Sequence, residues 1–443
     1  MPSMTDTPTP PSQFLAHLFR NPREPTRELV KPYVSYETGL RKAFARGDAG
    51  IDGLAGLVPV YNGAEKSFRI RTVDRQPATL SKYIMPLPDD KREANDVPAI
   101  AASRDEFMKN FDAFTHSMLK GIDIKIENDP TVENPHETYY QTTAPASDID
   151  VFFYGLGDDN SAIARIVQLE AELRVNQRIA PGSGLTLRSE NAVTFISPRW
   201  PYRHVQVILR LYRSVSEILT GFDVDCACVA FDGTNVYSNP RGVTAIATRT
   251  NTIDLTRRSP SYENRLYKYR NHNFDVFWDG LERERIDEQF FRDFAADYRK
   301  LSRLTGLARL IFSEAVLGRG AQEWYRWRRL MRRLDSGGEP ALAAPSGYAT
   351  LDIPYGRLFT AKSVCKYVSK RAKEPYLFGS IEKVTSWGAK PSKKMKGKLA
   401  GKVTFIRDNP GRQMIGSFYP LTDDDWTNMA YEPPSDVSEN EDE

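Results

Sequence analysis

The sequence is poor in the residues that build disulfide frameworks, zinc sites and membrane spans. Its 443 residues include three cysteines, too few for a disulfide framework, and Cys226 and Cys228 lack the second pair that a zinc site needs. None of the five histidines is spaced H-x-x-x-H. No apolar run approaches the ~18 residues of a membrane span, and residues 1–13 lack a signal-peptide core. We therefore expect buried thiols in a reducing compartment, cytoplasmic or nuclear.

The net charge is small as well. Lys+Arg 61 against Asp+Glu 58 leave a formal charge of +3, which argues against a chain that is basic throughout but permits local basic patches. With 40% hydrophobic and 27% charged residues, the composition is that of a globular protein. It excludes wholesale disorder and a collagen-like chain.

Changes of pattern along the chain predict an α+β fold, with a mixed sheet flanked by helices and a mostly helical region after it. Helices are expected over 103–119, 159–176, 214–219, 242–252, 261–269, 287–304 and 305–317, and strands over 147–155, 191–197, 204–212 and 223–231. The corresponding segments are a disordered lead (1–25), an N-terminal region of unclear fold (26–100), an α/β core (101–240), a helical region (241–335), a C-terminal region with a basic loop (336–430) and a disordered acidic tail (431–443).

Two Asp-x-Asp sequences carry the sharpest chemical signal. Asp148 and Asp150 precede one apolar run, and Asp223 and Asp225 precede another. Side chains two residues apart on a strand share one face, about 6.6 Å apart along it. Two such carboxylates can share a divalent ion, and a third from a neighbouring strand would complete an oxygen-rich Mg²⁺ site. Asp225 or Asp223 is the candidate for that third ligand, although aspartates at these places can also simply cap strand ends.

The residues from Ser147 to Phe152, Ser-Asp-Ile-Asp-Val-Phe, resemble the signature of the polymerase-β-like nucleotidyltransferase superfamily. The resemblance implies that Asp148 and Asp150 hold catalytic Mg²⁺ and that a third Asp lies on a later strand. Residues 103–274, and again 409–413, are similar to uncharacterised fungal and large-DNA-virus proteins of this kind, several of which carry ankyrin repeats elsewhere. About half of the chain is covered.

One part of that family's pattern is missing. Members of the family bind the triphosphate through a Gly-Ser or Gly-Gly helix turn before the first Asp. This chain has no glycine between Gly121 and Gly155. The hydroxyl of Ser147, or those of Thr142 and Thr143, can replace backbone contact only poorly. Three explanations stay open: a triphosphate-binding site that is built differently, a degenerate enzyme, or a segment missing from the sequence.

A glycosyltransferase uses Asp-x-Asp in another way, to hold the diphosphate of a sugar nucleotide through a metal. There the motif usually follows an apolar strand, whereas here the apolar runs come after the aspartates. This order, with the aspartates before the apolar run, favours nucleotidyl transfer over glycosyl transfer.

Three basic segments are candidates for binding phosphates or nucleic acid. Arg258, Tyr262 and Arg265 surround a Ser/Pro helix start, where arginines can neutralise a triphosphate and a tyrosine can stack on a base. The segment from Arg319 to Arg333 interleaves arginines with tryptophans, and the run from Lys390 to Lys398 is lysine-rich. For all three the alternative is a solvated basic face.

The sequence therefore predicts a Mg²⁺-dependent nucleotidyltransferase that uses an NTP, with Asp148, Asp150 and Asp225 as catalytic residues. The alternative is a catalytically degenerate member of the same fold that binds nucleic acid or protein, so whether the chain is an enzyme stays open.

Overall fold

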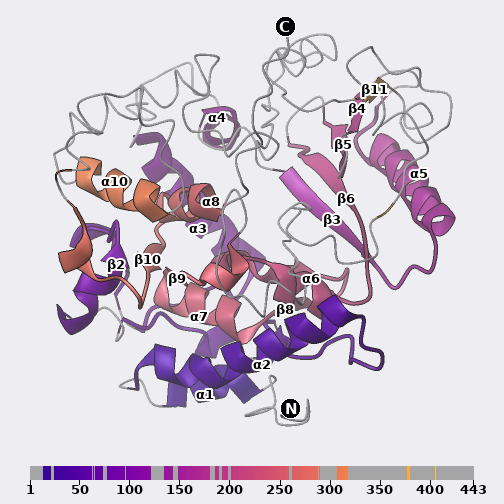
Figure 1. The fold of residues 1–443 in the computed structure, drawn as a ribbon. Helices are drawn as coiled ribbons and strands as arrows, with labels where there is room; N and C mark the ends of the chain where they lie inside the picture. The colour runs from indigo at the N-terminus through magenta and orange to yellow at the C-terminus, as the bar shows by residue number, and fades with distance from the viewer. Residues whose placement is uncertain are drawn as a thin grey trace, which may run out of the picture.

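The computed structural model describes residues 13–20, 24–120, 134–142, 148–179, 185–188, 192–197, 201–258, 262–287, 289, 307–317, 377–379 and 405, except positions 62, 64, 73–76 and 95 (Figure 1). Three sheets with helices around them make up this part, so the predicted α+β class is confirmed. Ser147, the segment 409–413, the two basic segments at 319–333 and 390–398, the acidic tail and nearly all of the predicted helix 287–304 lie outside the described residues.

The largest sheet has the strand order β11-β4-β5-β6-β3. Its strands are β3 (Asp148–Tyr154), β4 (Leu185–Arg188), β5 (Ala192–Ile196), β6 (His204–Tyr212) and β11 (Leu377–Gly379). β3 runs parallel to β6, and the other neighbours are antiparallel, so the sheet is mixed as expected. Among the described strands, β3 lies at the edge of this sheet.

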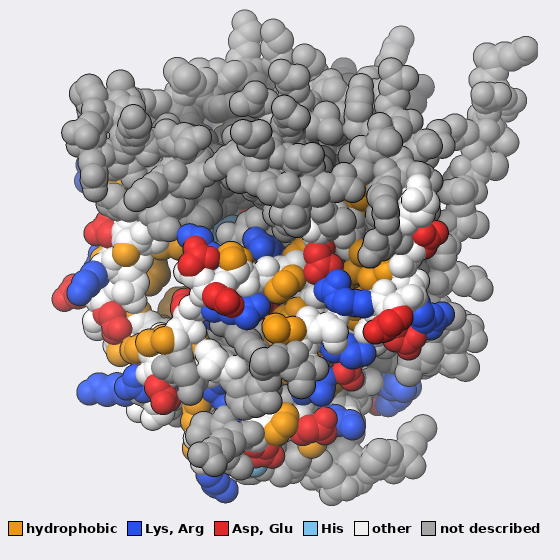
Figure 2. Space-filling view, turned by 90° about the vertical axis from the view of Figure 1, so that its left-hand side faces the viewer, with side chains coloured by type: hydrophobic (Ala, Val, Ile, Leu, Met, Phe, Trp, Pro, Cys, Tyr) orange, Lys and Arg blue, Asp and Glu red, His pale blue; other side chains and the backbone are white. Residues whose placement is uncertain are grey.

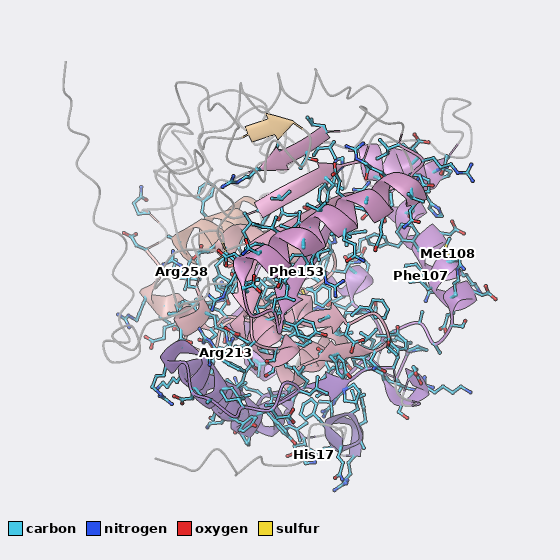
Figure 3. All side chains as sticks on the ribbon, turned by 90° about the vertical axis from the view of Figure 1, so that its right-hand side faces the viewer. His17, Phe107, Met108, Phe153, Arg213 and Arg258 are labelled. Carbon is cyan, nitrogen blue, oxygen red and sulfur yellow. The ribbon has the colours of Figure 1, made fainter. Side chains whose placement is uncertain are left out.

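One face of this sheet is covered by helix α5 (Asp159–Asn176), which crosses in front of the strands in Figure 3. Asp158 caps the helix by accepting the Ser161 N–H at 3.0 Å. Ile166 of the helix packs against Val193 and Val207 of the strands. Alternate residues of β6 supply this core, which is the period-two pattern of a strand.

The opposite face of the sheet changes from polar to apolar along β3. Asp148 and Asp150 lie at its start, in register with His204 and Gln206 of β6. Phe152 follows two residues later and packs against the core of Ala192 and Ile208. The carboxylate pair therefore stands at the polar end of a face that is otherwise buried.

A second body is built from residues far apart in the sequence. It contains α1 (Phe14–Arg20), α2 (Thr26–Arg46), α6 (Val215–Gly221), α7 (Pro240–Thr248) and an antiparallel sheet of β1 (Val58–Pro59), β8 (Val236–Ser238) and β7 (Val229–Phe231). Phe14, Leu15 and Leu18 pack with Val243 and Ala247 of α7. The predicted disordered lead is therefore wrong over Phe14–Arg20, because three of the large apolar side chains of this segment are buried in the core.

The third sheet has the order β2-β10-β9, with β2 (Tyr83–Ile84), β10 (Asp275–Phe277) and β9 (Thr250–Thr252). α8 (Tyr262–Arg270) and α10 (Leu307–Leu317) pack on it through Leu266 and Leu310. α3 (Arg104–Lys120) and α4 (Pro135–Thr142) lie near α8 in Figure 1. The remaining described helices are short 3-10 turns: η2 (Glu65–Ser67), η4 (Pro77–Lys82), η5 (Asp89–Lys91), η6 (Asp225–Ala227), η7 (Leu255–Arg257) and η8 (Arg283–Arg285).

Two predicted elements are corrected. The strand expected over 223–231 is limited to β7, because Asp225 begins the 3-10 turn η6 and its carboxylate accepts from Arg241 of α7 and from the Thr252 N–H. The helix expected over 242–252 ends at Thr248, where Arg249 takes a left-handed conformation with φ 52°. The next residues, Thr250–Thr252, form β9 instead. The helices predicted over 103–119, 159–176, 214–219, 261–269 and 305–317, and the strands over 147–155, 191–197 and 204–212, are confirmed to within a few residues.

Charged side chains of both signs are interspersed on the face that Figure 2 turns to the viewer. Among the helices of the described residues, none combines the length and the apolar character needed to cross a membrane.

Candidate functional site

Asp148 and Asp150 occupy the first and third positions of β3, so their side chains share one face of the sheet. Both residues are exposed at the start of this edge strand. The prediction that the pair lies together on one strand is confirmed. The strand begins at Asp148, one residue after the predicted start.

The surroundings of the pair make the carboxyl groups weaker acids. Loss of hydration to the surrounding protein raises the pKa of Asp150 to about 7, and the negative charge of Asp148 adds to this rise. The same loss of hydration raises the pKa of Asp148. Water reaches both carboxylates, but the protein around them displaces enough hydration to disfavour their charged forms. Two neighbouring carboxylates of this kind gain from a cation between them.

Three cationic side chains act on this pair, two from α8 and one from the residue before β6. Lys268 of α8 lowers the pKa of both aspartates, Arg265 of the same helix lowers that of Asp150, and Arg203 lowers that of Asp148. Lys268 is exposed and, among the described residues, makes no ion pair. Arg265 donates to Asp223. The site therefore combines negative charge on the sheet with positive charge on the elements facing it.

The second aspartate pair does not share this site. Asp225 is buried, and its Oδ1 accepts from Nη1 of Arg241 at 2.7 Å while its Oδ2 accepts the Thr252 N–H at 2.7 Å. Burial raises its pKa in spite of the arginine. Asp223 is buried as well, against Arg265.

No group of three or more His, Cys, Asp or Glu side chains is arranged to hold a metal ion among the described residues, which include all four aspartates. The expected convergence of Asp225 or Asp223 on the first pair is therefore not seen. The strand beside β3 carries His204 and Gln206 opposite the pair, where a third carboxylate was expected. His204 accepts the Ser197 N–H at its Nδ1, 3.0 Å away.

Two of the predicted phosphate- and base-binding residues are engaged elsewhere. Tyr262 is fully buried, and its hydroxyl oxygen accepts the Asp254 N–H at 3.1 Å, so it cannot stack on a base. Arg258 is paired with Glu263. Arg265 alone of this group acts on the carboxylate pair.

Sequence reasoning missed Lys268 and Arg203. Lys268 follows Arg265 by three residues, and this helical spacing places both on neighbouring positions of α8. Arg203 carries no comparable signal, because it directly precedes β6 and reaches the site only through the parallel pairing of β6 with β3. Its guanidinium lies 4.2 Å from the ring centre of Tyr140.

The two cysteines among the described residues offer no competing chemistry. Cys228 is buried, Cys226 is half-buried, and both are free. Burial raises the pKa of each thiol well above neutral pH, so neither is a thiolate there. The expectation of buried thiols holds for Cys228.

The described fold is thus an α+β protein whose largest sheet presents a carboxylate pair at its edge, faced by cations. Residues 101–249, about a third of the chain, match the model of the Gad2 family, described as Gabija anti-defense 2 family protein.

A curated relative, the "Uncharacterized protein R883" of Acanthamoeba polyphaga mimivirus, is 30% identical over 236 residues. The similarity covers 50% of this chain and 50% of the relative, so the chain spans about half the length of the curated relative it matches. The predicted likeness to uncharacterised viral proteins is confirmed by this relative. No solved structure matches the chain.

Proposed function

We propose that the chain binds the phosphate groups of an NTP together with Mg²⁺ at Asp148 and Asp150 and transfers the nucleotidyl group to an acceptor. One observation carries the proposal: two carboxylates of raised pKa share one face at the start of β3, with Lys268 and Arg265 acting on them. Anionic and cationic groups side by side suit a metal-bound phosphate, which presents both charges.

The residues present fit Mg²⁺ with two protein ligands. This ion is commonly held by one or two carboxylates and takes its remaining ligands from water and substrate phosphates. Asp148 and Asp150 would hold it, and it would polarise phosphate oxygens and neutralise charge on the leaving pyrophosphate. Lys268, exposed beside the pair, would bind phosphate oxygens that the metal leaves free. Arg265 would position the site by holding Asp223 away from it.

The test is calorimetric titration of the full chain with MgATP, alongside incorporation of α-labelled NTPs into RNA and protein acceptors. Asp148→Asn and Asp150→Asn should each abolish both signals. Asp232→Asn is the matched control, because Asp232 is exposed on a loop and accepts only local N–H groups. Wild-type affinity for MgATP in Asp150→Asn would overturn the assignment.

A second function is favoured by the position of Asp225. Its carboxylate is committed to Arg241 and Thr252, so the site has two carboxylates where the resemblance implies three. We propose as the alternative a nucleotide-binding module of the same fold that performs no transfer. Binding of MgATP without incorporation into any acceptor would decide for this module.

The family match supports one biological role for the chain, whether it is a nucleotidyltransferase or a nucleotide-binding module. We propose that the chain counteracts a Gabija defence system, since residues 101–249 match a family described as Gabija anti-defense 2. Co-expression with that system should abolish its protection. The same experiment with Asp150→Asn shows whether the carboxylate pair is needed for the effect.

A further inference from the structure

The ion pair between Asp223 and Arg265 joins the segment before η6 to helix α8. Asp223 is buried, whereas the side chain of Arg265 is partly exposed, so the carboxylate is the more enclosed member of the pair. The next residues of the two segments, Val224 and Leu266, are both buried in one apolar core. Because that core holds the two segments together, the Asp223 carboxylate keeps the guanidinium of Arg265 in one place.

This ion pair lies near the face of β3 that carries the carboxylate pair. Phe152 stands two residues after Asp150 on β3 and packs on the face opposite α5. Its ring centre lies 5.6 Å from that of Phe222, the residue directly before Asp223. In agreement with this placement, the charge of Arg265 lowers the pKa of Asp150.

Arg265 acts on Asp150 without binding to it. Within the described part of the chain no cation forms an ion pair with Asp150, and Arg265 donates to Asp223 instead. An arginine beside two carboxylates can pair with either of them, and a carboxylate taken up by an arginine offers fewer lone pairs to a metal ion. The pairing with Asp223 therefore leaves the Asp150 oxygens open and keeps a positive charge near them.

A charge that is fixed before a ligand binds contributes more to affinity than a mobile one. An exposed side chain such as that of Lys268 loses conformational freedom when it binds a phosphate, whereas Arg265 is already held by Asp223. Fixed charges of this kind stabilise transferring phosphoryl groups without a cost of reorganisation.

We propose that Asp223 is a positioning residue of the site at Asp148 and Asp150. It holds Arg265 where the guanidinium charge attracts the phosphates of the bound nucleotide, and it keeps that guanidinium off the Asp150 carboxylate. The inference rests on the proposed nucleotide binding. It gives Asp223 a role that is exerted through Arg265, in place of the direct metal contact expected from the sequence.

The experiment is a double-mutant cycle on the full chain, with MgATP binding measured by calorimetry. Asp223→Asn and Arg265→Gln should each weaken binding about tenfold, which corresponds to about 1.4 kcal/mol. The double variant should bind no more weakly than Arg265→Gln, because Asp223 acts through Arg265. A merely structural role of Asp223 would instead add to the loss of the arginine charge and weaken binding about a hundredfold.

Two further variants serve as controls. Arg265→Lys keeps the positive charge and should bind MgATP more tightly than Arg265→Gln. Glu170→Gln removes the acid of another arginine ion pair, in which Nη2 of Arg174 lies 2.9 Å from Oε1 of Glu170. That pair belongs to α5, on the other face of the sheet, so Glu170→Gln should bind MgATP like the wild type.

Wild-type affinity in Asp223→Asn, or additive losses in the double variant, would refute the role of Asp223. The proposed nucleotide binding would survive that result if Asp150→Asn still abolishes MgATP binding. If Asp223→Asn does not fold, Asp223→Glu takes its place in the cycle, since it keeps the ion pair and displaces the guanidinium by one methylene group. Absence of MgATP binding by the wild type would refute both proposals.

Discussion

Arg241 and Asp225 form an ion pair inside the protein, with Nη1 and Oδ1 2.7 Å apart. Both side chains are buried, and Arg241 also contacts Glu37, with its Nη2 3.1 Å from Oε1. The pair joins α7 to the turn η6 and thereby removes Asp225 from the surface. An aspartate that the sequence offers as a metal ligand is thus part of the internal framework.

Replacement of Asp225 should therefore destabilise the fold. In Asp225→Asn, Arg241 keeps a buried charge with one partner fewer, and loss of one member of a buried ion pair costs about 3–5 kcal/mol of unfolding free energy. Urea denaturation measures the effect. Asp232→Asn, the same chemical change on an exposed loop, should stay within about 0.5 kcal/mol of wild type. Equal stability of the two variants would show that the Asp225–Arg241 pair contributes nothing.

The Asp225–Arg241 pair also shows which contacts cannot be predicted from the sequence. The strand β6 was predicted to the residue, because its alternation of apolar side chains follows directly from having one face against α5. Asp148 and Asp150 were found because two residues on one strand keep their spacing in any fold. The surroundings of Asp225 were not predicted, because its partners, Arg241 and Thr252, come from later elements whose packing no local pattern encodes. Arg203 was missed for the same reason.

The close approach of α7 to η6 depends on Gly242. A methyl group at Gly242 would lie 2.8 Å from the Cys228 carbonyl oxygen and 2.4 Å from the Ser238 hydroxyl. Gly242→Ala should therefore lower the unfolding free energy by about 1–3 kcal/mol, the usual effect of overpacking a core. Gly39→Ala in α2 is the matched control. Nothing lies within 4 Å of that methyl, so the variant should gain about 0.5–1 kcal/mol. A Gly242→Ala protein as stable as Gly39→Ala would contradict the close packing.

The raised pKa of Asp150 predicts a pH-dependent stability. The carboxyl has a pKa of about 7 in the folded protein and an ordinary value of about 3.9 when unfolded. Between about pH 3.9 and about pH 7 the folded state binds more protons at this carboxyl than the unfolded state does. The unfolding free energy therefore falls as the pH rises through this range. Asp150→Asn removes this dependence. Compared with wild type, the variant should gain stability on going from about pH 5 to about pH 8, as urea midpoints measure. A constant difference between the two proteins would mean that the pKa of Asp150 is not raised.

Mg²⁺ should bind in competition with that proton. Because the ion needs deprotonated ligands, its affinity for Asp148 and Asp150 should rise with pH through about 7. At a free concentration ten times its Kd, a ligand specific for the folded state adds about 1.4 kcal/mol to stability. Thermal unfolding at about pH 8 should therefore show a rise in Tm with MgCl₂ that vanishes in Asp150→Asn and shrinks at about pH 5.5. NaCl of equal ionic strength separates this effect from screening, which acts on all exposed charges. If MgCl₂ and NaCl raise the Tm of the wild type equally, the two carboxylates do not form a magnesium site.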